Sequence, residues 1–283
     1  MIRSQFVASL ISGLVSPKTV KVPDGFETIE RRWGGIIGVY AIDLDSGRTL
    51  EHRAAQRFPL ASTQKLPLVM AALDRVDRGR DRLDAPVRIL KNDLEPPYSD
   101  IAQKYPQGTT LSLASVCEYA ISNSDNTAAD VLCRRIGGPA AVTAYLRQLG
   151  VSDVRVDRYE RDLHSPASLT EPRDTGTPHA MAYLVVRLVT RPALSQRSTL
   201  LLLAWMHEVV TGDARLRAGV PPGWSVADKT GSYQNASNDI GLLVPPHGKP
   251  IAIACYAFGN HGNLGGSHAI ADAARLAIRT LRG

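Results

Sequence analysis

The chain has 283 residues, of which 44% are hydrophobic and 21% are charged. This balance is typical of a soluble globular protein, and the length suffices for one large core or two modest ones. The formal charge is +6 and the isoelectric point is about 9.3. Because the arginines are scattered and no basic run alternates with aromatic residues, we expect no nucleic-acid partner.

The N-terminal stretch, residues 1–24, begins with one basic residue before an apolar run from Phe6 to Val15. Two interpretations stay open. The stretch is either a weak export signal, although no A-x-A cleavage site follows, or an extension that forms a short amphipathic helix. The run is too short for an ordinary transmembrane helix, so we expect no membrane span.

Strands are expected near both ends of the chain. The β-branched and apolar run 36–44 ends at the turn D-S-G, and a second strand follows at 49–52. Three more strands are expected at 224–232, 239–244 and 251–258. The sequence Pro-Pro-His-Gly between the last two is a turn signal.

Helices are expected between these strands, because apolar residues recur there at helical spacing. Their ranges are 66–73, 111–122, 127–136, 140–149, 179–189 and 198–210, and one more helix is expected at 268–281. Strands at both ends with helices between them predict an α/β (α+β) fold with two lobes. One lobe is an antiparallel sheet flanked by helices, from about 25–60 and 211–283, and the other is all-helical, from about 61–210. Residues 25–283 are expected to form a single unit.

The cysteines and histidines show no metal-binding pattern. Cys117, Cys133 and Cys255 form neither C-x-x-C nor another ligand spacing, and the seven histidines lack H-x-H and H-E-x-x-H. We therefore expect three buried thiols and no metal or cofactor.

The first motif with chemical content is A-S-T-Q-K, from Ala61 to Lys65. On a helix, positions three apart share a face, so the Lys65 amine would stand beside the Ser62 hydroxyl and help to remove its proton. A helix N-terminus would also favour developing oxyanion charge. By itself the signal is weak, because a helix cap followed by a solvated lysine explains it better.

Two further motifs follow. S-D-N, Ser124 to Asn126, joins two expected helices, and it offers a hydroxyl for proton relay and an amide for a carbonyl, or simply an N-cap. K-T-G-S, Lys229 to Ser232, lies in an expected strand, where glycine permits another backbone or a ligand to approach closely. The alternative is an edge strand protected by its lysine.

Together and in this order, the three motifs resemble the set found in class A serine β-lactamases and penicillin-binding proteins. Further matches are D-R-Y-E-x-x-L, I-G-G at 136–138, P-x-G-W-x-x-A-D-K-T-G and N-D-I at 238–240. The resemblance covers the chain from about Phe26 onward. It implies the fold shared by serine β-lactamases and D,D-peptidases. It also implies a resistance enzyme that hydrolyses the β-lactam amide of penicillins and cephalosporins.

The resemblance also implies a role for each matching residue. Ser62 would form the acyl-enzyme, and the backbone N–H groups of Ser62 and Ser232 would form the oxyanion hole. Lys65, or Glu160 through a water, would take the serine proton, and this alternative stays open. The other catalytic residues would be Ser124 and Lys229, and the substrate-binding residues would be Asn126, Thr230, Gly231, Ser232, Arg215, Tyr98 and His164.

Glu160, in the segment R-Y-E-R-D-L-H, decides between the related activities. Penicillin-binding peptidases and β-lactam sensors stay acylated, whereas a positioned general base gives roughly 10²–10⁴-fold in rate. The loop around Glu160 resembles the family's omega loop, and Arg158 and Asp174 match the ion pair that closes its neck. A D,D-peptidase and a sensor module are the alternatives, and Glu160 argues against both.

Several positions depart from the commonest pattern. His164 and Asp130 replace two asparagines, and the loop is one residue longer between Glu160 and Asp174. The first two changes resemble the extended-spectrum PER branch. We expect a coupled pair with a His164–Asp130 hydrogen bond that supports the loop, and independent change at the two sites is the alternative.

The carboxylate anchor also departs from the pattern, because Ser237 stands where many members carry an arginine. In other members the arginine comes from an upstream R-x-R segment, which R-L-R at 215–217 matches. Arg215 is therefore the expected anchor, with a surface charge as the alternative. Tyr98 is expected at the entrance of the site, unless Pro97 takes that place. The protein is expected to be a periplasmic or secreted bacterial monomer whose small-molecule partners are β-lactams.

Overall fold

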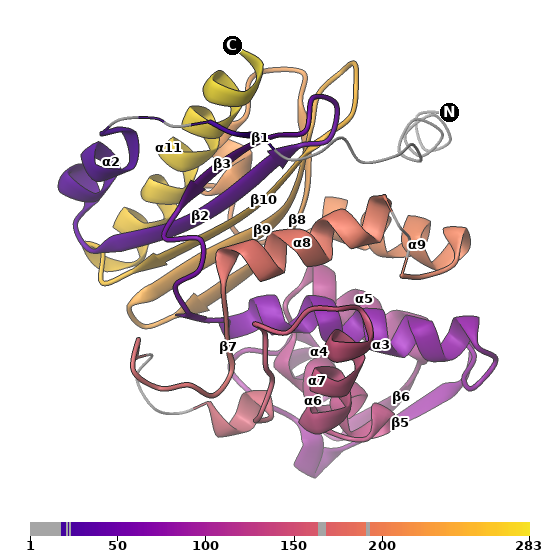
Figure 1. The fold of residues 1–283 in the computed structure, drawn as a ribbon. Coiled ribbons are helices and arrows are strands. Elements are labelled where there is room, and N and C mark those ends of the chain that lie inside the picture. The colour runs from indigo at the N-terminus through magenta and orange to yellow at the C-terminus, as the bar shows by residue number, and fades with distance from the viewer. Residues whose placement is uncertain (1–17, 21, 23, 164–167, 191–192) are drawn as a thin grey trace.

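A six-stranded sheet forms the centre of the upper lobe in Figure 1. The computed structural model describes residues 18–20, 22, 24–163, 168–190 and 193–283. The strand order is β1-β3-β2-β10-β9-β8. The strands are β1 (Lys18–Thr19), β2 (Ile36–Asp43), β3 (Arg48–His52), β8 (Ser225–Tyr233), β9 (Ala236–Val244) and β10 (Ile251–Phe258).

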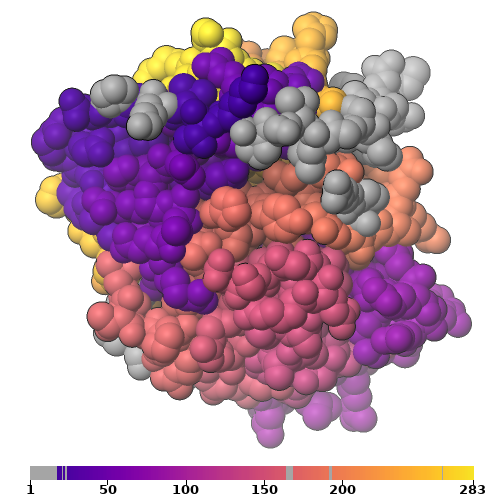
Figure 2. Space-filling model, viewed as in Figure 1, coloured from indigo at the N-terminus to yellow at the C-terminus, as the bar shows by residue number. Residues whose placement is uncertain are grey.

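Strand β10 joins the two ends of the chain in this sheet. It pairs antiparallel with β2, from Ile251 opposite Asp43 to Phe258 opposite Ile36. Its other edge pairs antiparallel with β9. The expected antiparallel sheet from both chain ends is therefore confirmed, with the short β1 added parallel to β3. Figure 2 shows the result on the surface, where the indigo and the orange-to-yellow parts of the chain lie together in the upper half.

Helices cover both faces of the sheet. Helices α2 (Gly25–Trp33) and α11 (Gly262–Arg282) pack on one face, and α8 (Pro178–Val189) packs against β2, β9 and β10 on the other. Every residue of β10 except Phe258 is buried, as expected for a strand with apolar cover on both sides. Helix α8 belongs in sequence to the segment 61–210, yet in space it lies between the sheet and the other helices.

The lower part of Figure 1 is mainly helical. A 3₁₀ turn, η1 (Ala61–Gln64), leads into α3 (Lys65–Asp77), whose first nine residues are buried; a helix that is apolar nearly all round lies inside a protein. Around α3 lie α5 (Leu113–Ser122), α6 (Asn126–Ile136), α7 (Pro139–Gln148) and α9 (Gln196–His207). The shorter elements η2 (Lys91–Asp93), α4 (Asp100–Lys104) and η3 (Glu160–Asp162) contact α6, whereas α10 (Leu216–Gly219) packs against α11 and β8 in the sheet lobe.

The structure adds two small sheets that the sequence did not predict. One is the hairpin β5 (Pro86–Leu90) and β6 (Gly108–Ser112), and the other pairs β4 (Phe58–Pro59) with β7 (Thr175–Gly176). Strand β6 takes the first two residues of the helix expected at 111–122, because Ser112 caps α5 by accepting a hydrogen bond from the Ser115 amide. The three cysteines are free and buried, as expected.

The expected N-terminal helix or export signal falls on residues 1–17, which lie outside the described part of the chain. Among the residues that the structure describes, no helix has the length and apolarity needed to cross a membrane.

Candidate active site

Ser62 lies in the 3₁₀ turn η1, one turn before the position at which a helix was expected to begin. The Thr63 amide and hydroxyl both donate to the Leu60 carbonyl, at 3.2 and 2.6 Å, and tighten this turn. Ala61 has a φ of 45°, a left-handed conformation that is costly for a residue with a Cβ. The backbone is therefore bent sharply just before the serine.

Lys65, the first residue of α3, is completely buried and points at three acceptors. Its Nζ donates to Ser62 Oγ at 3.0 Å, to the Ser124 carbonyl at 2.6 Å and to Asn126 Oδ1 at 2.6 Å. Burial lowers the pKa of Lys65, and the negative charges of Glu160, Asp125 and Asp130 oppose this shift. The predicted contact between the lysine and the serine is present, and the solvated-lysine alternative is wrong.

Lys229, on β8, is the second buried lysine of the site. Its Nζ donates to Ser124 Oγ at 2.9 Å and to the Thr230 carbonyl at 2.9 Å. Burial lowers the pKa of Lys229 to about 7, with a further contribution from the charge of Lys65. Strand β8 is indeed an edge strand, but its lysine faces the site and not solvent.

Ser124 and Asp125 divide the two functions that S-D-N was expected to offer. The Asp125 carboxylate is the N-cap of α6 and accepts from the Ala128 amide. It also accepts from Ser99 and the Ile101 amide. Ser124, with a φ of 57°, is left free of capping and reaches Lys229.

Glu160 lies at the same place, although it comes from the distant loop. Its Oε1 is 3.6 Å from Lys65 Nζ and accepts from Gln64 Nε2 at 3.0 Å. The side chain is only 8% exposed, so the carboxylate does not face bulk solvent. Asp130, on α6, holds the backbone of this turn by accepting from the amides of Glu160 and Arg161, at 2.7 and 3.2 Å.

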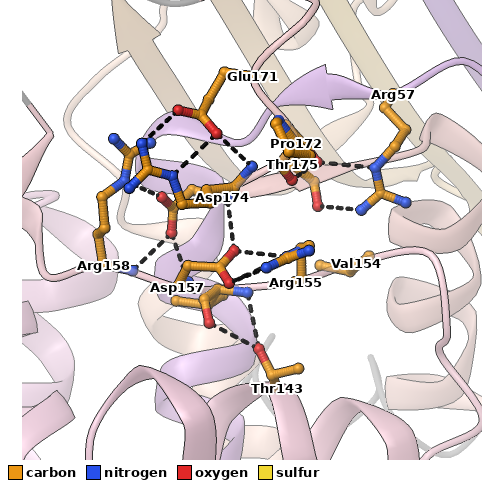
Figure 3. A network of polar contacts seen from close by, with 12 residues as sticks. Arg57, Thr143, Val154, Arg155, Asp157, Arg158, Glu171, Pro172, Asp174 and Thr175 are labelled. Atoms are coloured by element: carbon orange, nitrogen blue, oxygen red, sulfur yellow. Dashed lines mark hydrogen bonds and ion pairs between the residues drawn. The ribbon is translucent and has the colours of Figure 1, made fainter. Parts of the chain in front are cut away.

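The neck of the loop is closed by charged side chains (Figure 3). Arg158 Nε donates to Asp174 Oδ2 at 2.5 Å, and the amides of Asp157 and Arg158 donate to Asp174 Oδ1. Asp157 accepts from the Asp174 amide in return. The expected Arg158–Asp174 ion pair is present, and Asp174 is almost completely buried.

Comparisons with known proteins agree with this geometry. Residues 24–281 match the family model described as the beta-lactamase enzyme family. A carbapenem-hydrolysing β-lactamase KPC from Klebsiella oxytoca is 38% identical over 263 residues, which cover 92% of this chain and 89% of the relative. The chain belongs to the class A serine β-lactamases.

Solved structures of class A β-lactamases share the fold. A reconstructed ancestral (GNCA) class A β-lactamase is 40% identical, with a TM-score of 0.85 over 92% of this chain and 99% of the other. A β-lactamase from Xanthomonas campestris pv. campestris is 36% identical, with a TM-score of 0.85 over 92% of this chain and 96% of the other. The expected fold and the hydrolysis of β-lactams are thereby confirmed.

In this β-lactamase, β8 runs directly beside the turn that contains Ser62. A Cβ built on Gly231 would lie 2.9 Å from the Leu60 carbonyl oxygen and 3.1 Å from the Thr63 amide nitrogen. Only glycine permits this approach, as the K-T-G motif predicted. Ser232, the next residue, is exposed, so the strand carries its hydroxyl to the opening of the site.

Arg215 immediately precedes α10 and is only 6% exposed, so the surface-charge alternative is wrong. Its guanidinium donates to the carbonyls of Gly231 and Asn238, at 2.8 Å each, and to the hydroxyls of Ser232 and Ser267. Burial lowers the pKa of Arg215. The contact with Ser232, at 2.5 Å, is the one directed to an exposed residue.

Of the two residues expected at the entrance, Tyr98 and His164, the structure describes only Tyr98. Tyr98 is 74% exposed, and its carbonyl accepts from the Asn126 amide at 3.0 Å, so it borders the S-D-N segment. His164 lies outside the described residues, and with it the expected His164–Asp130 hydrogen bond. In the described part of the loop, Arg161 Nε donates to Asp130 at 3.1 Å.

Sequence reasoning missed three residues that support the site. Gln64 stands inside the first motif, but no pattern indicated its bond to Glu160. Asn238 donates to the carbonyls of Pro59 and Leu60, at 2.8 and 3.0 Å, and ties β9 to the segment before Ser62. Tyr233 donates its hydroxyl to the carbonyl of Leu163, at 2.8 Å, and joins the end of β8 to the loop. The N-D-I match was the one signal that pointed to Asn238.

Proposed function

We propose that the chain hydrolyses penicillins and cephalosporins through an acyl-enzyme on Ser62 that is deacylated by a water activated by Glu160. One observation carries the proposal. The Lys65 amine lies 3.0 Å from the nucleophile and 3.6 Å from the carboxylate, so the groups for both half-reactions meet at one atom.

Acylation begins when the Ser62 hydroxyl attacks the lactam carbonyl. As an ammonium, Lys65 uses all three hydrogens on its three acceptors; as a neutral amine it would instead present a lone pair to the serine. Its lowered pKa favours that neutral form. We propose two routes for the serine proton, directly to Lys65 or through a water to Glu160. The backbone N–H groups of Ser62 and Ser232 form the oxyanion hole.

Ring opening requires a proton on the leaving lactam nitrogen. We assign this step to Ser124, whose hydroxyl is 2.9 Å from Lys229 Nζ. A cation at that distance favours proton donation by the hydroxyl and stabilises the transient alkoxide. Lys229 also adds positive charge for the substrate carboxylate.

Substrate binding divides between the two sides of the site. Asn126 holds the acylamido carbonyl, and Thr230, Gly231 and Ser232 lie along the edge strand beside the ring. Arg215 supplies the positive charge for the carboxylate, acting beside Ser232. Tyr98 and His164 are proposed at the entrance.

Deacylation depends on Glu160 as general base. Its low exposure and its bond from Gln64 support the proposal, because they fix the carboxylate toward the Ser/Lys pair. A positioned base gives roughly 10²–10⁴-fold in rate, which corresponds to about 3–5 kcal/mol of barrier. That difference separates a turnover enzyme from a stalled adduct.

The deciding experiment uses the variant Glu160→Gln with a chromogenic cephalosporin. The wild type is expected to show steady turnover, whereas the variant is expected to give one stoichiometric burst and a lasting adduct on Ser62 in intact-mass spectra. Asp162→Asn, an exposed carboxyl two residues away, is the matched control and should turn over like the wild type. Full turnover by Glu160→Gln would contradict the proposed base.

The same measurement tests the D,D-peptidase and sensor alternatives, for both of which the wild type itself would stall after one burst. Carbapenems should be tested as a separate class of substrate, because the relative from Klebsiella oxytoca is named for hydrolysing them. We further propose a monomer of the periplasm or the extracellular space, without nucleic-acid partners, in which residues 25–283 act as one catalytic unit.

A further inference from the structure

Two aspartates lie side by side behind the site, on the two strands that form its sheet side. Asp228 belongs to β8 and Asp239 to β9, and both are completely inaccessible to solvent. In the strand register Asp228 lies opposite Gly241, and Asp239 lies opposite Thr230. The two side chains are therefore diagonal neighbours on one face of the sheet.

In each carboxyl group, one oxygen receives no hydrogen bond from the described part of the chain. Asp228 Oδ2 and Asp239 Oδ1 are buried, and neither accepts a hydrogen bond from a group that the structure describes. The other oxygens are used: Arg217 donates to Asp228 Oδ1 at 2.6 Å, and the Leu216 amide donates to Asp239 Oδ2 at 3.2 Å. The carboxyl groups lie within hydrogen-bonding reach of each other. A single proton between them would satisfy both orphan oxygens.

Burial decides how many charges the pair can carry. Two carboxylates in contact and out of water cannot both ionise, so one of them keeps a proton. Asp228 is the better anion, because Arg217 and Lys229 favour its charge. Burial and the neighbouring Asp228 raise the pKa of Asp239 well above its usual range. Besides Asp228, the titratable groups that interact electrostatically with Asp239 are Arg215 before α10, Lys229 on β8, and Cys255 and Tyr256 on β10. Of these, Cys255 lies directly opposite Asp239 in the strand register. Arg217, on α10, interacts with Asp228.

We propose that Asp239 is protonated and donates to Asp228, and that this pair positions Arg215 and keeps its charge available for the substrate. Asp239 accepts from the amide of Leu216, the residue after Arg215, while Arg215 itself donates to the carbonyl of Asn238, the residue before Asp239. Asp239 therefore holds the backbone next to Arg215, and it directly follows the residue whose carbonyl binds the guanidinium.

The proton matters because of what Arg215 does not bind. Within the described residues, its guanidinium donates to four acceptors, all of them neutral carbonyl or hydroxyl oxygens. An ionised Asp239 would add an anion that competes with the substrate carboxylate for the guanidinium. Held neutral, Asp239 orients the backbone without quenching the positive charge. Asp239 is thus a positioning residue; this inference rests on the proposed role of Arg215.

The first test compares Asp239→Ala with Asp239→Asn. Asparagine matches the protonated acid, because its amide N–H₂ can donate to Asp228 and its oxygen can accept from Leu216. Asp239→Ala should raise KM for a cephalosporin about tenfold or more, with a smaller change in kcat, because a misplaced anchor weakens orientation. Asp239→Asn should restore KM to within about twofold of the wild type. If asparagine were as damaging as alanine, the charge of Asp239 would be required and the proposal would be wrong.

The second test needs no substrate. Isotope-edited infrared spectra near neutral pH should show the carbonyl stretch of one protonated carboxyl group in the wild type, and Asp239→Asn should remove it. Above the unfolded-state pKa the unfolded chain releases this proton while the folded chain keeps it. The unfolding constant of the wild type should therefore rise by up to tenfold per pH unit relative to Asp239→Asn. No such band, or equal pH slopes, would overturn the shared proton.

These results separate the inference from the proposed function. If Arg215→Ala leaves KM unchanged, Arg215 is not the carboxylate anchor, and the positioning role of Asp239 is wrong. If the infrared band is present in the same protein, the shared proton is still supported.

Discussion

The basic residue Lys229 and the acidic residue Glu160 are held in the site in different ways. Lys229 belongs to β8, which pairs with β9 without interruption from Ser225 opposite Val244 to Tyr233 opposite Ala236. Glu160 belongs to a loop whose backbone is held by carboxylates, namely Asp130 at the turn and Asp174 at the neck. The strand is fixed by backbone bonds that no single substitution removes, whereas the loop depends on a few side chains.

This difference suggests where the enzyme is vulnerable. Segments with few backbone bonds open at a lower free-energy cost than strands inside a sheet. Changes around the loop should therefore slow deacylation first and leave acylation by Ser62 largely intact.

Removing the carboxylate at the neck should have the largest effect. Asp174→Ala leaves the mostly buried Arg158 without its partner and strains a position with a φ of 53°. We expect a loss of about 3–5 kcal/mol in the free energy of unfolding, measured in urea. Asp174→Asn keeps an acceptor and tolerates the left-handed backbone, so it should lose about 1–3 kcal/mol.

The strand supplies the control for this prediction. Ser225→Ala, at the start of β8, should change the free energy of unfolding by less than about 0.5 kcal/mol. Equal losses at Asp174 and Ser225 would show that the loop is no more dependent on side chains than the strand.

Asp130→Asn should have a smaller effect. Asparagine has one acceptor oxygen, whereas Asp130 accepts from two amides and from Arg161 Nε. We expect a loss of about 1–3 kcal/mol and a slower deacylation rate, measured by the decay of the acyl-enzyme in mass spectra. Unchanged stability and turnover would contradict the predicted coupling of Asp130 to the loop. Asp162→Asn serves again as the control.

A pH profile should distinguish the strand from the loop. Since the pKa of Lys229 is lowered to about 7, kcat/KM should fall by up to tenfold per pH unit above that value, about 1.4 kcal/mol per unit. In Lys229→Arg the fall should move to higher pH, because a guanidinium stays charged. Between pH 7 and 10.5 the folded state binds fewer protons than the unfolded state at this residue, so Lys229 contributes stability that rises with pH. If kcat/KM fell at the same pH in both proteins, the fall would be due to the titration of another group.

The bond that joins the two regions should matter least. Tyr233→Phe removes the hydroxyl that donates to the Leu163 carbonyl, and a neutral hydrogen bond contributes about 0.5–1.5 kcal/mol. We expect deacylation to slow a few-fold and the acylation rate, followed by stopped-flow absorbance, to stay constant. A larger loss in acylation than in deacylation would mean that Tyr233 supports the strand and not the loop.

Local sequence signals predicted most of the elements and the residues that meet at the candidate site. Apolar runs located β2, β8, β9 and β10, and helical spacing located α3, α6 and α8. These segments are buried, and their own residue pattern indicates burial without reference to the segments that pack against them. The spacing of Ser62 and Lys65 predicted their contact because it is local. The motifs Ser124–Asn126 and Lys229–Ser232 predicted a site only through their resemblance to a family.

Features that depend on distant partners were not predictable in this way. The hairpin of β5 and β6 crosses a gap that contains η2 and α4, and nothing local indicates that pairing. The bond from Gln64 to Glu160 spans two segments that meet only after folding. The Asp228–Asp239 contact depends on strand register, which the composition of β8 and β9 does not specify.

The central place of β10 has a consequence for biosynthesis. Because β10 lies between β2 and β9, and follows both in the chain, a ribosome must deliver residue 258 before the N-terminal hairpin and the K-T-G strand can belong to one sheet. A nascent chain that stops short of that point cannot join β2 to the strand that carries K-T-G. The complete sheet therefore forms late in translation, and a premature stop codon before residue 258 should abolish resistance.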